Sequence, residues 1–103
     1  MEKYQIRVLG STSYLFGGKS IDISGGDFNS LLIIRNDEFG EPISISLVRR
    51  PITQPEEHID IGILQPSEVF AVDLKNTVRV EAKCTEAFVD SLVYCTIATK
   101  LTQ

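Results

Sequence analysis

Apolar and polar residues alternate along most of this chain, a pattern typical of strands that are buried on one face only. Each alternating stretch is short and is closed by glycine, proline, asparagine or aspartate, which favour turns. The pattern predicts about eight strands, at 4–8, 21–23, 31–35, 43–47, 59–63, 70–74, 78–84 and 93–97. We therefore expect an all-β protein in which residues 1–103 form a single antiparallel β-sandwich domain, either jelly-roll or immunoglobulin-like.

The residues between these strands predict how the strands connect. Residues 36–42 have the composition of a hairpin loop. Residues 65–68, Gln-Pro-Ser-Glu, place proline at the second position of a type I turn. Residues 49–58 contain two prolines, which a central strand does not tolerate, so we expect this stretch to cross from one sheet to the other.

Two cysteines, Cys84 and Cys95, raise the question of a disulfide. Residues 78–84 and 92–99 are expected to form a hairpin, with Cys84 near its loop and Cys95 about four residues along the opposite arm. At about 3.3 Å per residue this separation exceeds 10 Å, whereas a disulfide needs Cα atoms within about 7 Å. We therefore expect two buried thiols that pack as small hydrophobes, which suits a reducing compartment.

One predicted strand breaks the alternation, because residues 31–34 are Leu-Leu-Ile-Ile and are apolar on both faces. Such a strand is favourable only when both of its faces are covered. Either another part of the same chain or a partner subunit could cover the outer face, and the sequence leaves both open. Four residues are apolar where the alternation of their strand predicts a polar residue, which favours a partner subunit on that side; they are Leu9, Val48, Leu64 and Val69. The candidate interface residues are Leu31, Leu32, Ile33, Ile34, Val48, Leu64 and Val69.

Composition argues against several classes of function. A formal net charge of −4 disfavours non-specific binding to nucleic acid, which depends on neutralising phosphates. No apolar run approaches the roughly 20 residues of a membrane span, so no membrane partner is expected. Met1, Glu2 and Lys3 precede no apolar segment, so we expect no secretory signal.

A glycine-rich motif at residues 17–20, Gly-Gly-Lys-Ser, resembles the end of a phosphate-binding loop. The full pattern needs a glycine where this chain has Ser13, and it needs a helix after the lysine. Strand-like residues follow instead. We expect a glycine turn and no nucleotide.

The remaining polar residues do not form a recognisable catalytic or metal-binding set. His58 is the only histidine and lies near Asp60, while Asp37, Glu38 and Glu41 share one acidic loop. Neither group has the number and spacing of ligands that zinc or calcium sites require. A nucleophilic serine or cysteine would need a neighbouring base and an orienting acid. We therefore expect a protein that is not an enzyme and has no catalytic, cofactor-binding or metal-binding residues.

The order of signals from Leu31 onward is similar to that of small β-sandwich proteins of the decoration or cement type on tailed-bacteriophage capsids. Many of these share the order strand, Leu-x-Pro-Gly-Glu, strand, Val-x-Val-x-Ala. In this chain Ser67 replaces the glycine, which a type I turn tolerates. The matching segments are 32–36, 42–47, 59–64, 66–68, 70–74 and 78–82.

This resemblance implies a structural protein of the virion, made in the host cytoplasm, without catalysis. It further implies small homo-oligomers, with trimers favoured, bound to a major capsid protein. It transfers no individual functional residue.

A second hypothesis is a carbohydrate-binding or adhesin-like module that uses loops 36–42 and 49–58. Aromatic rings that stack on sugars would then come from Tyr4, Tyr14, Phe16 and Phe39.

Overall fold

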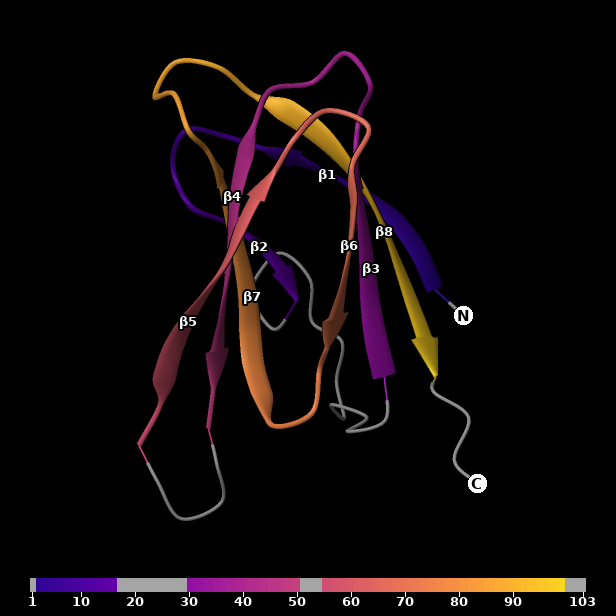
Figure 1. Cartoon of the computed structure of the whole chain (residues 1–103), viewed down its shortest axis with the longest axis vertical. Coiled ribbons are helices and arrows are strands. Elements are labelled where there is room, and N and C mark those ends of the chain that lie inside the picture. Colours follow the sequence, from indigo (N-terminus) through magenta and orange to yellow (C-terminus); the bar gives the residue numbers. More distant parts are fainter. Residues whose placement is uncertain (1, 17–29, 51–54, 100–103) are drawn as a thin grey trace.

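The computed structural model describes residues 2–16, 30–50 and 55–99, which form eight strands and no helix (Figure 1). The predicted all-β sandwich is thus confirmed. The expected strand at 21–23 and the glycine motif at 17–20 lie outside the described residues. The strands are β1 (Glu2–Val8), β2 (Ser13–Phe16), β3 (Ser30–Asn36), β4 (Ile43–Arg49), β5 (Glu57–Leu64), β6 (Val69–Asp73), β7 (Thr77–Cys84) and β8 (Ser91–Thr99).

The strands form two four-stranded sheets, and their order is that of a jelly roll. One sheet has the order β1-β8-β3-β6 and is called the β3 sheet below; the other has the order β2-β7-β4-β5 and is called the β4 sheet. Antiparallel pairs join β1 to β8, β2 to β7, β3 to β6 and β4 to β5, as in one long hairpin that has been rolled up. The topology therefore selects the jelly roll over the immunoglobulin-like sandwich.

Three expected connections are wrong, because consecutive strands of this jelly roll lie in opposite sheets except for β4 and β5, which pair with each other. Residues 37–42 lead from the β3 sheet to the β4 sheet and do not close a hairpin. Strands β4 and β5 are neighbours in one sheet, with Arg49 opposite Glu57, so the proline-containing stretch is no crossover. Strands β7 and β8 lie in different sheets and form no hairpin.

Both cysteines are buried, as predicted, and both are free thiols. The sequence analysis wrongly placed them on the two arms of one hairpin, because Cys84 belongs to the β4 sheet and Cys95 to the β3 sheet.

The core lies between the two sheets, and two bulges decide which residues enter it. In β5, Gly62 lies opposite Ile45 and Asp60 opposite Ser46, which leaves Ile61 as the extra residue. This reverses the alternation, so Leu64 is fully buried in the core while Ile63 is 50% exposed. In β2, a similar irregularity buries both Leu15 and Phe16. This strand was missed because it has only four residues and does not alternate.

The turn between β5 and β6 differs in type from the expected one. The amide of Glu68 donates a hydrogen bond to the carbonyl of Gln65 (3.0 Å), and Ser67 has a φ of 71°. Proline at the second position and a positive φ at the third define a type II turn, for which glycine is preferred. The serine at position 67 is therefore strained, contrary to the type I expectation.

Replacing Ser67 by glycine should stabilise the protein by about 0.5–1 kcal/mol. The left-handed conformation costs a non-glycine residue about 1–2 kcal/mol, and the extra freedom of glycine in the unfolded chain offsets part of this gain. Urea denaturation measures the change. Ser67→Ala, which keeps the Cβ atom, is the control and should bring no gain; equal stability of the two variants would contradict the strained turn.

Candidate interaction surface

The outer face of the β3 sheet carries the apolar residues that broke the sequence pattern. On β3, Leu31 and Ile33 are half-buried and point away from the core, while Leu32 and Ile34 point into it. Directly opposite Ile33 lie Ala71 of β6 and Thr96 of β8, which share its face. The outer side of this sheet is therefore more apolar than a solvated face normally is.

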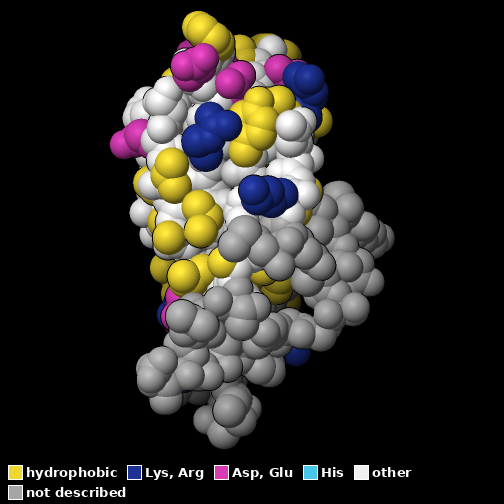
Figure 2. Space-filling model, turned by 90° about the vertical axis from the view of Figure 1, so that its right-hand side faces the viewer, with side chains coloured by type: hydrophobic (Ala, Val, Ile, Leu, Met, Phe, Trp, Pro, Cys, Tyr) yellow, Lys and Arg dark blue, Asp and Glu magenta, His cyan; other side chains and the backbone are white. Residues whose placement is uncertain are grey.

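A basic residue and an aromatic ring complete this surface. Arg35 lies opposite Val69 and Tyr94, and its guanidinium carbon is 4.3 Å from the centre of the Tyr94 ring, a cation–π contact. Figure 2 shows hydrophobic and basic side chains mixed on this side of the molecule. We call the outer-facing set the sheet face; it consists of Lys3, Gln5, Arg7, Leu31, Ile33, Arg35, Val69, Ala71, Asp73, Leu92, Tyr94, Thr96 and Ala98.

Only three of the seven candidate interface residues belong to the sheet face, namely Leu31, Ile33 and Val69. Val69 is 54% exposed. The other four have no exposed surface and cannot contact a partner in this fold, which corrects the sequence analysis. They are Leu32, Ile34 and Leu64, which lie in the core cluster, and Val48, which is buried outside it.

Four connections meet at one end of the sandwich, at the top of Figure 1, because β1, β3, β5 and β7 all end there. These connections, residues 9–12, 37–42, 65–68 and 85–90, are called the loop end below. They contain the carboxylates of Asp37, Glu38, Glu41, Glu68, Glu86 and Asp90, and no lysine or arginine. The loop end also holds three of the large exposed apolar side chains, Leu9 (45% exposed), Phe39 (87%) and Phe88 (101%). No local sequence pattern predicts that these residues come together.

Asn36 holds the loop end together from a fully buried position. Its side-chain amide donates hydrogen bonds to the carbonyls of Glu41 (2.8 Å) and Leu64 (3.1 Å). Its side-chain oxygen accepts one from the hydroxyl of Ser91 (2.8 Å). Since Leu64 belongs to the β4 sheet and Ser91 to the β3 sheet, this side chain joins both sheets to the loop after β3. The sequence analysis missed Asn36; its only signal was an amide closing an apolar strand.

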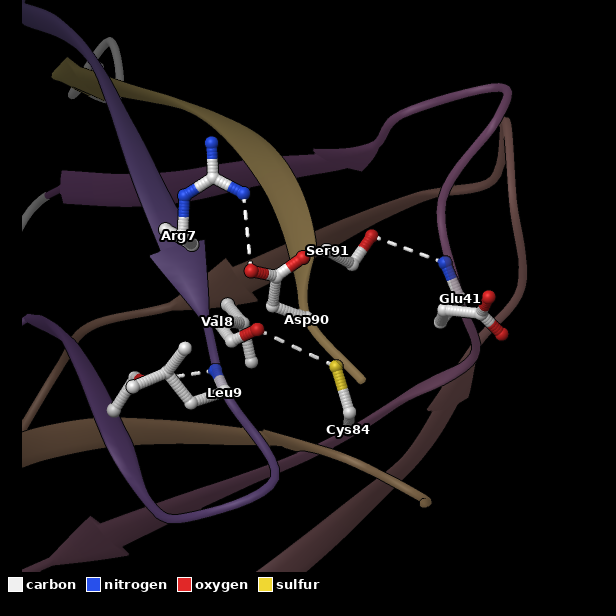
Figure 3. Close-up of polar contacts among 8 residues, drawn as sticks. Arg7, Val8, Leu9, Glu41, Cys84, Asp90 and Ser91 are labelled. Atoms are coloured by element: carbon white, nitrogen blue, oxygen red, sulfur yellow. Dashed lines mark hydrogen bonds and ion pairs between the residues drawn. The ribbon is translucent and has the colours of Figure 1, made fainter. Parts of the chain in front are cut away.

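Further contacts tie the loop end to the strands below it (Figure 3). The backbone amide of Glu41 donates to the Ser91 hydroxyl (3.1 Å), and Arg7 forms an ion pair with Asp90 (3.1 Å). The thiol of Cys84 donates to the carbonyl of Val8 (3.3 Å). These contacts fix where the exposed side chains of the loop end project.

An open groove of about 600 Å³ lies at the loop end. Its walls are residues 9–11 and 87–90, with Glu41 at one side. At its base Gly10 packs so closely on the backbone of Ala87 that an added Cβ atom would overlap it. The groove thus combines apolar walls with carboxylates.

The two loops proposed for sugar binding lie at opposite ends of β4, so they cannot form one site. Their aromatic partners are also separated. Phe16 is in the core, and the hydroxyl of Tyr4 donates to the carbonyl of Leu15 (2.6 Å). Phe39 projects from the loop end, whereas Tyr14 lies opposite Glu81 in the β4 sheet. A shallow polar hollow of about 220 Å³ on the outer face of that sheet contains no aromatic residue.

The titratable groups give no further candidate site. Among the described residues, no three histidine, cysteine, aspartate or glutamate side chains are grouped as metal ligands would be. Burial raises the pKa of Cys95 to about 12, partly opposed by a side-chain interaction with Tyr4. Burial, followed by the charges of Asp90 and Glu41, also raises the pKa of Cys84. Both thiols are therefore protonated at neutral pH, and a thiol is a poor nucleophile.

Within the three described ranges, no helix is long and apolar enough to span a membrane. No protein-family model, curated protein or solved structure matches the chain, so its assignment as a jelly roll depends on its own strand order.

Proposed function

We propose that this protein is a non-enzymatic structural subunit that associates with copies of itself and decorates the capsid of a tailed bacteriophage. The observation that carries the proposal is the sheet face, where Leu31, Ile33 and Val69 present apolar surface around Arg35. Clustered apolar side chains on the outside of a small domain are typical of protein interfaces. Arginine and tyrosine, which meet here, are also enriched where interfaces bind most strongly.

Many weak contacts suffice for a protein of this kind. Each 100 Å² of apolar contact contributes only about 2.5 kcal/mol. A subunit that touches neighbouring copies and a major capsid protein gains from several such contacts at once. We propose a small oligomer, with a trimer favoured, located in the virion after synthesis in the host cytoplasm.

Self-association is tested by sedimentation velocity at high micromolar concentration. We expect oligomers of the wild type and monomers of an Arg35→Glu/Val69→Asp variant, which places two carboxylates opposite each other on β3 and β6 of the sheet face. Ile63→Asp/Lys83→Glu is the matched control, because these exposed residues flank Ser44 on the outer face of the β4 sheet. A monomeric wild type, or equal loss of assembly in the control, would contradict the proposal.

Capsid decoration is tested separately. We expect the gene to lie beside that of a major capsid protein. We also expect the protein to sediment with the corresponding capsids, in a fixed ratio to the major capsid protein of their surface lattice. A gene located in a polysaccharide-utilisation cluster, or protein that never sediments with capsids, would count against this role. The carbohydrate-binding alternative now lacks a common site for its loops, and we do not propose it.

A further inference from the structure

We infer that the partner of the sheet face is the loop end of a second copy, so that the chain associates head to side. This inference rests on the proposed self-association and names the two surfaces that meet. In this arrangement, another copy of this chain covers the sheet face, and another copy covers the groove at the loop end.

The charges of the two surfaces are complementary. The sheet face presents Lys3, Arg7 and Arg35 against one carboxylate, Asp73. Arg7 and Asp90 form an ion pair within one copy, so neither adds net charge to its surface for a partner. Besides Asp90, the loop end carries five carboxylates and no basic residue. Opposite charges on two patches steer association and align the partners.

The same charges disfavour the two symmetric alternatives. A face-to-face dimer would place two surfaces with an excess of basic residues against each other, and an end-to-end dimer would place two sets of carboxylates together. Like charges placed opposite each other across an interface repel and suppress such pairings. Of these three arrangements, only the head-to-side contact places the basic sheet face against the acidic loop end.

Apolar surface is present on both sides of the proposed contact. Phe39 and Phe88 are almost fully exposed at the loop end, and Leu9 forms a wall of the groove beside Phe88. On the sheet face, Leu31, Ile33 and Val69 offer a flat apolar area. Aromatic residues, phenylalanine included, are enriched in the buried centre of protein interfaces.

The placement of the two surfaces determines the kind of assembly. A contact between two different patches is heterologous, and repeating it produces a closed ring or an open filament. The loop end and the sheet face lie on adjacent sides of the molecule, not on opposite sides (Figure 1). Each added copy therefore turns relative to the last, which favours a small closed ring over a straight filament.

Mixing two assembly-deficient variants tests this inference. The face variant is Arg35→Glu/Val69→Asp, and the end variant is Phe39→Ser/Phe88→Ser; all four side chains are exposed. We expect the end variant to lose at least tenfold in self-association and the face variant to be monomeric. Their equimolar mixture should form a species of two copies and nothing larger, because it retains one intact face and one intact end.

Each outcome of the sedimentation experiment decides a separate point. An end variant that assembles like the wild type would overturn the head-to-side contact and leave self-association through the sheet face intact. A mixture that stays monomeric would also overturn it. A monomeric wild type would overturn the proposed function itself. Thermal melting of both variants close to that of the wild type shows that folding is unaffected.

Discussion

Replacing Asn36 by leucine is expected to lower the free energy of unfolding by about 3–5 kcal/mol, a large part of the 5–15 kcal/mol that holds a typical domain together. Leucine has a similar branched shape but cannot make the three hydrogen bonds of the Asn36 side chain. The carbonyls of Glu41 and Leu64 would lose the side-chain amide of Asn36, a fully buried residue, as their hydrogen-bond donor. A buried acceptor left without a partner costs about 1–3 kcal/mol.

Urea denaturation of Asn36→Leu and Asn36→Asp distinguishes lost hydrogen bonds from altered packing. The aspartate variant is nearly isosteric, and its ionised carboxylate would face two carbonyl oxygens. It should recover stability at acidic pH, where the protonated carboxyl can again donate to one of them. Ser91→Ala removes one hydrogen bond with Asn36 and one with the Glu41 amide, but leaves the Asn36 amide paired with both carbonyls, so it should cost less than either. A loss below about 1 kcal/mol in Asn36→Leu would show that the buried amide does not hold the loop end together.

Gly10→Ala is expected to destabilise the protein by about 2–3 kcal/mol, because a Cβ atom at this position would overlap the backbone of Ala87. A side chain could rotate away, but here the backbone of the 85–90 connection would have to move. That movement would stretch the hydrogen bond from the Cys84 amide to the Leu9 carbonyl (2.8 Å). The groove at the loop end would then change shape.

Thermal melting and amide hydrogen exchange check this prediction together. A loss of 1 kcal/mol lowers the melting temperature of a domain of this size by about 4–8 °C. The Cys84 amide should exchange faster in Gly10→Ala. Ser11→Ala changes an exposed neighbour on the same loop and should leave both measurements unchanged. A Gly10→Ala variant that melts like the wild type would mean that the two connections are not in close contact.

The candidate surface was only partly predictable from the sequence. Residues 31–34 are all apolar, which predicted a strand with apolar side chains on both of its faces. Leu31 and Ile33 do lie on the outer face. Leu64 was wrongly predicted to lie at an interface, because the bulge at Ile61 reverses the alternation of its strand. Val69 was correctly placed, since no bulge interrupts its strand. Alternation identifies a face only as far as the next bulge.

The sequence alone determined the class of fold, because strand alternation and turn residues are local properties that each segment carries by itself. It also correctly predicted that both cysteines are buried. Only the tertiary structure decided which strands pair, since pairing β1 with β8 or β3 with β6 depends on long-range packing that no local pattern encodes. For the same reason only the fold could gather six carboxylates and three exposed apolar residues from four separate connections at one end of the sandwich.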